Sequence, residues 1–213
     1  MKDFAVLGEQ DVISDRSLVY KLLSRAWQYP DNTVYTWLAG KFQKALKRGL
    51  KASGTKLETS VIPPQKSQVK LAADYTSNFD VGLAKPACSL NEGLCSVLDR
   101  LTVFKELVLF YNHFGLSSAD SKFLPDHLVM ELEFMHYLSF KEEVAISQKE
   151  DPYPYIRAQR DFLERHLICW LPKIRDGVKI LEIDPFYPSL SEFTFQWVHR
   201  DLQSLSARVL QVA

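Results

Sequence analysis

The stretch from residue 120 to residue 144, DSKFLPDHLVMELEFMHYLSFKEEV, constrains the fold more than any other part of the chain. Its apolar residues recur at helical spacing along two lines: Leu128, Leu132 and Met135 on one, and Met130, Phe134 and Leu138 on the other. A helix that is apolar around most of its girth has to be covered on several sides. The sequence therefore predicts a central helix that runs to about residue 148.

Pro125 and Asp126 predict where this helix begins. Proline is pre-set for a first helical turn, and a carboxylate there suits the free N–H groups and the positive end of the helix dipole. We therefore expect Asp126 to stabilise the first turn. The polar side chains on this otherwise apolar helix are the first candidates for a functional site: Asp126, His127, Glu131, Glu133 and His136.

Helical spacing also describes most of the remaining chain, and no region alternates apolar and polar residues for long enough to predict a strand. Eight glycines in 213 residues are few for a turn-rich β fold. Gly115 is expected to be left-handed at a helix end, and Ser14 or Asp15 to cap the first helix. Further helices are expected at about 16–27, 33–50, 69–79, 93–114, 155–171, where Pro172 ends the helix, and 190–212. The predicted fold is a single all-α domain over residues 1–213, a bundle of roughly seven to ten helices.

Composition limits which cellular compartment and which classes of partner can be expected. The formal net charge is zero, so no global field selects a nucleic acid or a membrane surface. No segment approaches the roughly 18 consecutive apolar residues of a membrane span, and the N-terminal apolar run is too short for a secretory signal. Cys88, Cys95 and Cys169 are odd in number and form no CxxC pair, which indicates free thiols in a reducing compartment. The sequence predicts a cytoplasmic protein.

One charge run stands out in this neutral chain. Residues 41–56 hold six Lys or Arg residues and no acid. The run is either the solvated face of a helix or a contact surface for an acidic partner.

Glu133 and His136 have the i, i+3 spacing that helical bundles use in di-iron sites. Such a site needs a second Glu-x-x-His and two more helical glutamates, and the chain has no second copy of the motif. A metal-binding bundle remains an alternative, but we expect no metal. The structural interpretation is a local hydrogen bond between Glu133 and His136.

Asp126 and His127 could also form half of a catalytic pair in which the carboxylate orients the imidazole. No nucleophile elbow accompanies them, although a thiol enzyme that uses Cys88 or Cys95 stays open. The chain contains no GxxxxGK[ST] or GxGxxG loop, so no nucleotide site is supported. A small helical enzyme is the second alternative, with no catalytic residue assigned.

A binding function fits the region better. Residues 120–151 hold eight acids against three lysines, beside apolar residues that include Phe123, Met130 and Phe134. An apolar groove with an acidic rim would suit a peptide that is apolar with a basic end. Methionines such as Met130 help a surface of this kind adapt to its ligand.

Several motifs together resemble the TorD/DmsD/NarJ family of redox-enzyme maturation chaperones over about residues 15–205. The Pro125-Asp126-His127 motif with Leu132-Glu133-Phe134 is the most specific of them. The other matching motifs are Tyr75-x-x-x-Phe79 with Gly82, residues 86–92, Phe110-Tyr111-x-x-Phe114-Gly115-Leu116, Phe162, His166-Leu167, Trp170-Leu171-Pro172 and Phe186-Tyr187. Leu124 stands where many relatives have glutamate. In this respect the chain resembles the chaperones of nitrate reductases and of related periplasmic enzymes.

The resemblance implies an all-helical cytoplasmic chaperone, monomer or dimer, that is not an enzyme and carries no cofactor or metal of its own. It implies as partner the catalytic subunit of a molybdenum oxidoreductase of the dimethyl-sulfoxide-reductase type. The chaperone would bind the subunit's N-terminal twin-arginine leader and delay export until the molybdenum cofactor is inserted. No nucleic acid and no stable membrane insertion are expected. The residues expected to bind the leader peptide are Tyr75, Phe79, Glu92, Asp126, His127 and Met130.

Overall fold

The all-α prediction is confirmed by a computed structural model, which describes residues 2–3, 15–55, 57, 59–80, 86–119 and 121–212. Within these residues the chain forms ten α-helices and one π-helical segment. In order they are α1 (Asp15–Ala26), α2 (Asn32–Trp37), the π-helical η1 (Leu38–Phe42), α3 (Gln43–Ser53), α4 (Gln68–Asn78), α5 (Glu92–Cys95), α6 (Arg100–His113), α7 (Leu128–Gln148), α8 (Tyr153–Arg165), α9 (Leu167–Lys179) and α10 (Phe186–Val212).

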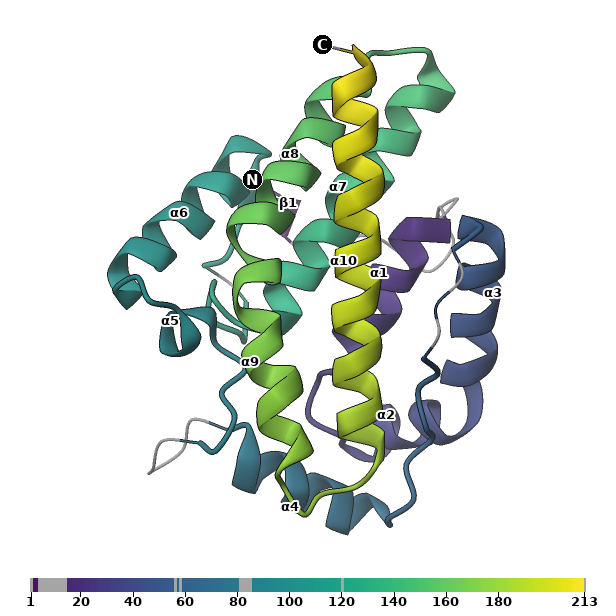
Figure 1. Cartoon of the computed structure of the whole chain (residues 1–213), viewed down its shortest axis with the longest axis vertical. Coiled ribbons are helices and arrows are strands. Elements are labelled where there is room, and N and C mark those ends of the chain that lie inside the picture. The colour runs from purple at the N-terminus through teal and green to yellow at the C-terminus, as the bar shows by residue number, and fades with distance from the viewer. Residues whose placement is uncertain are drawn as a thin grey trace.

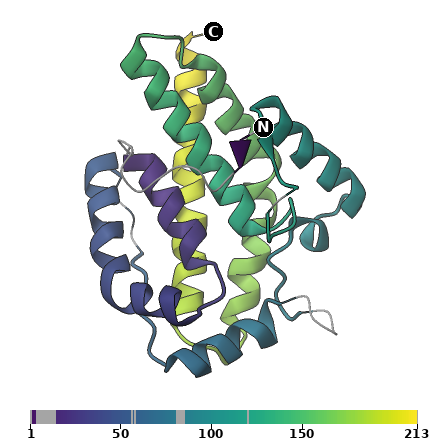
Figure 2. The same cartoon turned by 180° about the vertical axis from the view of Figure 1, so that it is seen from behind.

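Helix α7 is central, as its apolar pattern predicts. It packs against α1 on one side and α8 on another, and Leu128, Leu132, Phe134, Met135 and Leu138 are all buried. The long helix α10 packs against α8 and α9, while α1 also packs against α3. Figure 1 shows α8, α9 and α10 in front, and Figure 2 shows α1 and α7 on the opposite face.

Short helices close the two flanks of this bundle. Helices α5 and α6 lie on one side of the molecule, α3 lies on the other, and α4 crosses the end opposite the C-terminus (Figures 1 and 2). Gly115 ends the α6 region with a φ of 72°, so the left-handed conformation predicted there is confirmed. Two two-residue strands, β1 (Lys2–Asp3) and β2 (Leu116–Ser117), pair in parallel.

Three helix boundaries differ from the prediction. The last helix begins at Phe186 rather than at about residue 190. The helix expected at 93–114 is divided into α5 and α6, because Asp99 starts a new helix by accepting a hydrogen bond from the N–H of Thr102 at 3.1 Å. The helix expected to stop at Pro172 continues through it to Lys179. The break lies instead at His166, whose φ of −118° and ψ of −92° separate α8 from α9.

Two further points bear on the sequence expectations. Among the described residues, no helix is both long and apolar enough to cross a membrane. Ser14, the alternative cap of the first helix, and Gly82, which belongs to the family motif, lie outside the described residues.

Candidate functional site

Two distant segments meet at the start of α7. The N–H of Glu92 donates to the carbonyl of Asp126 at 2.8 Å, and the N–H of Leu128 donates to the carbonyl of Leu90 at 2.8 Å. Asn91 and His127 form an antiparallel bridge between these bonds. The structure therefore brings together Glu92, Asp126 and His127, although they are far apart in the sequence.

Asp126 is completely buried at this junction, with 0% of its surface exposed. Its Oδ1 accepts a hydrogen bond from Asn91 Nδ2 at 2.8 Å, and its Oδ2 accepts one from the N–H of Gly93 at 3.2 Å. Arg100 Nε lies 3.4 Å from the same Oδ2. A buried carboxylate needs such partners to offset the loss of hydration, so Asp126 ties α5 and α6 to the start of α7.

The expected role of Asp126 in the first turn of the helix is wrong. Helix α7 begins at Leu128, and its N-cap is His127, whose Nδ1 accepts a hydrogen bond from the N–H of Val129 at 3.2 Å. Burial lowers the pKa of His127 to about 4, so its imidazole is neutral and free to accept that bond. The ring of His127 stacks on Phe123 with 4.6 Å between centroids.

A second set of buried polar groups includes Glu92, the residue that binds the backbone of Asp126. Glu92 Oε2 is 3.0 Å from His166 Nδ1, with both residues buried, and Trp170 Nε1 donates to Glu131 Oε2 at 3.2 Å. Burial and the neighbouring carboxylate of Glu92 raise the pKa of Glu131 well above its ordinary value. We call these groups the polar corner, which consists of Asn91, Glu92, Arg100, Asp126, Glu131, His166 and Trp170.

The remaining predicted peptide-binding residues are buried. Met130 lies in the first turn of α7, where its Sδ accepts a hydrogen bond from Ser121 Oγ at 3.1 Å. Tyr75 and Phe79 belong to a separate aromatic cluster around Trp27 and Tyr187. Of the six predicted peptide-binding residues, all of which the structure describes, His127 is the one that keeps partial exposure.

The acidic residues of α7 do not form the expected rim. Glu133 is bound by Lys21, at 2.9 Å, and by Ser24, and Glu142 is bound by Arg16 and Arg208. The side chains of these acids point toward α1 and α10, where cations neutralise them. Asp120, the first acid of that region, lies outside the described residues.

Glu133 and His136 do not bond to each other as the sequence suggested. His136 Nδ1 instead lies 2.7 Å from Ser17 Oγ, and burial lowers the pKa of this histidine to about 4. Both residues of the Glu-x-x-His motif therefore fasten α7 to α1. Among the described side chains, no group of three or more His, Cys, Asp or Glu is arranged to hold a metal ion.

The side chains that could have formed a catalytic pair have structural roles instead. Asp126 bonds to Asn91, Gly93 and Arg100, and the His127 side chain caps α7. Burial raises the pKa of the Cys88 thiol to about 12, and a thiol of that pKa is a poor source of the reactive thiolate.

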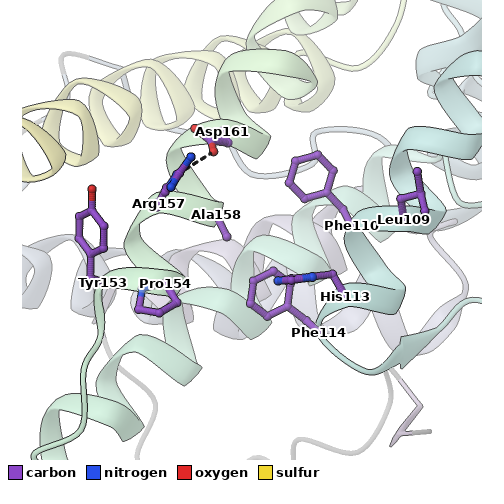
Figure 3. Close-up of a pocket in the computed structure, with 9 residues that line it drawn as sticks. All are labelled: Leu109, Phe110, His113, Phe114, Tyr153, Pro154, Arg157, Ala158 and Asp161. Carbon is purple, nitrogen blue, oxygen red and sulfur yellow. Dashed lines mark ion pairs between the residues drawn. The ribbon is translucent and has the colours of Figure 1, made fainter.

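An open cleft lies between α6 and α8, with a volume of about 630 Å³. Figure 3 shows Phe110 of α6 and Phe114, which follows α6, on one side of the cleft, and Tyr153 and Pro154 of α8 on the other. The full lining is Leu109, Phe110, His113, Phe114, Tyr153, Pro154, Arg157, Ala158 and Asp161. Aromatic walls with a few charged groups are typical of a site for an apolar ligand.

The cleft borders both the polar corner and an exposed apolar surface. The ring of Phe110 packs against His166 with 5.6 Å between centroids. Four large apolar side chains are exposed on this flank, two in the segment between α5 and α6 and two on α6: Val97, Leu98, Leu101 and Leu109. Exposed apolar side chains that follow one another closely in the chain are candidates for an interaction surface.

Sequence reasoning missed part of this site. Asn91, Arg100, His166 and Trp170 complete the polar corner, and the exposure of Val97, Leu98, Leu101 and Leu109 was not predicted. His166 and Trp170 both stand in the motifs that carry the family resemblance, so that signal was present. Nothing in the local sequence of α6 distinguishes its exposed leucines from its buried ones.

Comparison with known proteins identifies the family. The family model described as nitrate reductase delta subunit matches residues 43–176. The perchlorate reductase assembly chaperone protein of Dechloromonas aromatica is 31% identical over 96% of each chain. The selenate reductase assembly chaperone protein of Thauera selenatis is 35% identical over 73% of this chain and 72% of its own. Chaperone protein TorD of Vibrio parahaemolyticus is 26% identical over 63% of this chain and 64% of its own. Together with the all-helical fold, these matches show that the chain belongs to the TorD/NarJ family of redox-enzyme maturation chaperones and is not an enzyme.

Proposed function

We propose that this protein is a cytoplasmic chaperone dedicated to one molybdenum oxidoreductase of the dimethyl-sulfoxide-reductase type. The observation that carries the proposal is the match along nearly the whole chain to an assembly chaperone for perchlorate reductase. Relatives named for selenate reductase and chlorate reductase support the same class of client. The chaperone binds the catalytic subunit before export and releases it once the molybdenum cofactor, which belongs to the client, is in place.

The N-terminal leader of the client binds at the cleft between α6 and α8 and along the exposed apolar face of α6. In this arrangement Phe110, Phe114 and Leu109 receive apolar leader side chains. Asp161, at the edge of the cleft, is the carboxylate for a leader arginine, which would compete there with Arg157, at 3.7 Å, and with Arg160, whose Nε donates to Asp161 Oδ1 at 2.8 Å. His127, half-buried against Phe123 at the start of α7, lies outside the lining of this cleft.

The buried residues that we predicted to bind the leader have an indirect role in this proposal. Glu92, Asp126 and Met130 hold α5, α6 and the start of α7 in place, and so position the walls of the cleft. Tyr75 and Phe79 support α4 from the core. Substitution of Glu92, Asp126 or Met130 would therefore alter leader binding through the shape of the site, whereas Tyr75 and Phe79 do not line this cleft.

The affinity follows from the size of the cleft. Burial of three or four leader side chains contributes about 1.5–3 kcal/mol each, and the ordering of the peptide offsets much of that gain. The net result is near micromolar, roughly −8 kcal/mol. The electrostatic part weakens with salt, since exposed charges are screened within about 8 Å at physiological ionic strength.

The maturation step is tested in the host by deletion of the gene. The catalytic subunit of the host's molybdenum oxidoreductase is purified from the deletion strain and from the parent, and its molybdenum content is measured. We expect a several-fold loss of molybdenum that the intact gene restores. A subunit that is fully loaded in the deletion strain would contradict the proposal.

A further inference from the structure

A row of cations covers the outer face of α3 and the preceding π-helical turn. Lys41, Lys44, Lys47, Arg48 and Lys51 are all exposed. Four of them, at positions 41, 44, 48 and 51, recur at spacings of three and four residues, so they share one side of the helix. We call these five residues the basic stripe. At 1.5 Å per residue the stripe is about 15 Å long.

The fold presents this stripe rigidly. Leu38, Phe42 and Leu46, on the opposite side of the same helical segment, are buried in the core, and α3 packs against α1. Helix α3 ends at Ser53, and the next residue, Gly54, is left-handed with a φ of 67°. Lys56, the last cation of the run in the sequence, lies outside the described residues.

The stripe differs from the cations that hold the bundle together. Arg16, Lys21, Arg100 and Arg208 each form an ion pair with a buried or half-buried carboxylate. Within the described part of the chain, no ion pair joins any of the five stripe cations to an acid. Neighbouring like charges on a helix destabilise it slightly. A contribution to the stability of the fold therefore does not explain why the five cations are there.

We propose that the basic stripe is a second docking surface for the client, and that it binds an acidic face of the catalytic subunit outside the leader. This inference rests on the proposed function. A twin-arginine leader is itself basic and would be repelled by the stripe, whereas an acidic face is complementary to it. Helix α3, which carries the stripe, and helix α6, which lines the cleft, lie on opposite sides of the molecule (Figure 1), so the two contacts are separable by mutation.

Other polyanions fit the stripe less well. An amphipathic helix that binds a lipid surface inserts its apolar face, but the apolar face of this helix is occupied by the core. Single-stranded nucleic acid is bound by cations combined with aromatic side chains. Gly40 and Ala45, which line the same hollow as the five cations, supply no ring. Trp37 lies beside Lys41 alone, at one end of the stripe, and the guanidinium of Arg25 covers its ring at 4.5 Å.

The test uses a charge reversal and a matched control in the full chain. The stripe variant carries Lys44→Glu and Arg48→Glu, and the control carries Lys70→Glu and Lys149→Glu, at two exposed cations outside the stripe. Both variants change the net charge equally. Surface plasmon resonance measures each against the full-length catalytic subunit of the host's molybdenum oxidoreductase, and against its synthetic leader peptide, at low and high salt.

We expect the stripe variant to bind the full-length subunit on the order of tenfold more weakly at low salt, mainly through slower association. We expect it to bind the leader peptide like the wild type, and the control to bind both ligands like the wild type. The difference between the variants should vanish in about 0.5 M salt, where screening is nearly complete.

Three outcomes would overturn the inference. Equal weakening by the stripe variant and the control would show that only net charge matters. A stripe-dependent loss confined to a 20-nucleotide single strand or to anionic phosphatidylglycerol vesicles would assign the stripe to another partner. If the wild type binds neither the subunit nor the leader, the proposed function fails, and this inference fails with it.

Discussion

The carboxylate of Glu92 and the imidazole of His166 form a buried pair, with 3.0 Å between Oε2 and Nδ1. Glu92 begins α5, and His166 is the residue at which α8 breaks from α9. The pair therefore links the small α5–α6 flank to the main bundle. The wall of the cleft that α6 provides depends on this link.

Removal of either partner of this buried pair should destabilise the folded protein. We expect Glu92→Ala to lower the free energy of unfolding by about 3–5 kcal/mol, because His166 is left buried without its partner. Glu92→Gln keeps an acceptor for the imidazole and should cost clearly less. Urea unfolding measures both variants, and equal losses would show that the contact with His166 is not what matters.

Asp126→Ala should likewise destabilise the protein more than a role at a helix dipole allows. A first-turn carboxylate contributes about 0.3–1 kcal/mol. Here the substitution strands Asn91 Nδ2, the N–H of Gly93 and part of Arg100, so we expect a loss of roughly 2–4 kcal/mol. A loss under about 1 kcal/mol in the same urea experiment would contradict the buried geometry.

Gly93 and Gly40 form a matched pair for testing the packing of the polar corner. A Cβ at Gly93 would lie 2.5 Å from Arg100 Cγ and 3.0 Å from Asp126 Oδ2, whereas a Cβ at Gly40 meets nothing within 4 Å. We expect Gly93→Ala to destabilise the protein by about 1–3 kcal/mol. Gly40→Ala should be neutral or stabilise by up to about 1 kcal/mol. Thermal melts compare the two, and a tolerated alanine at position 93 would show that the corner is loose.

Glu131 gives the unfolding free energy a specific dependence on pH. Burial and Glu92 raise its folded-state pKa well above the unfolded value of about 4.3. Between those two values the folded state holds a proton that the unfolded state has released, so stability falls as pH rises through this window. Glu131→Gln removes this titration and keeps an oxygen for Trp170 Nε1. We expect the Tm of Glu131→Gln minus that of the wild type to increase from pH 5 to pH 8, and a constant difference would place the pKa of Glu131 near its ordinary value.

The helical spacing of the sequence was enough to predict the main body of the fold. The α7 pattern predicted both its central place and its end at Gln148, since apolar residues on every side require cover on every side. Pro172 misled the prediction, because a buried contact of His166 placed the helix break six residues earlier. Local sequence signals do not include such tertiary contacts.

The site was only partly predictable for the same reason. The Pro-Asp-His motif located the start of α7, but the partners of Asp126 come from residues 91, 93 and 100, and no local spacing connects them. The acids of α7 looked like a rim because their cations, Lys21, Arg16 and Arg208, are distant in sequence. Exposure of Leu109 likewise depends on which helices cover α6.

Isothermal titration of the client's leader peptide tests the central claim most directly, with Leu109→Glu and Leu210→Glu as a matched pair. Both leucines are exposed on helices, at 68% and 77%, so neither substitution should disturb the fold, but Leu109 lines the cleft and Leu210 lies near the end of α10. We predict near-micromolar binding by the wild type and by Leu210→Glu, and binding at least tenfold weaker by Leu109→Glu, through lost apolar burial of about 1.5 kcal/mol or more. Equal affinities for all three proteins, or equal binding of a scrambled leader, would contradict the account.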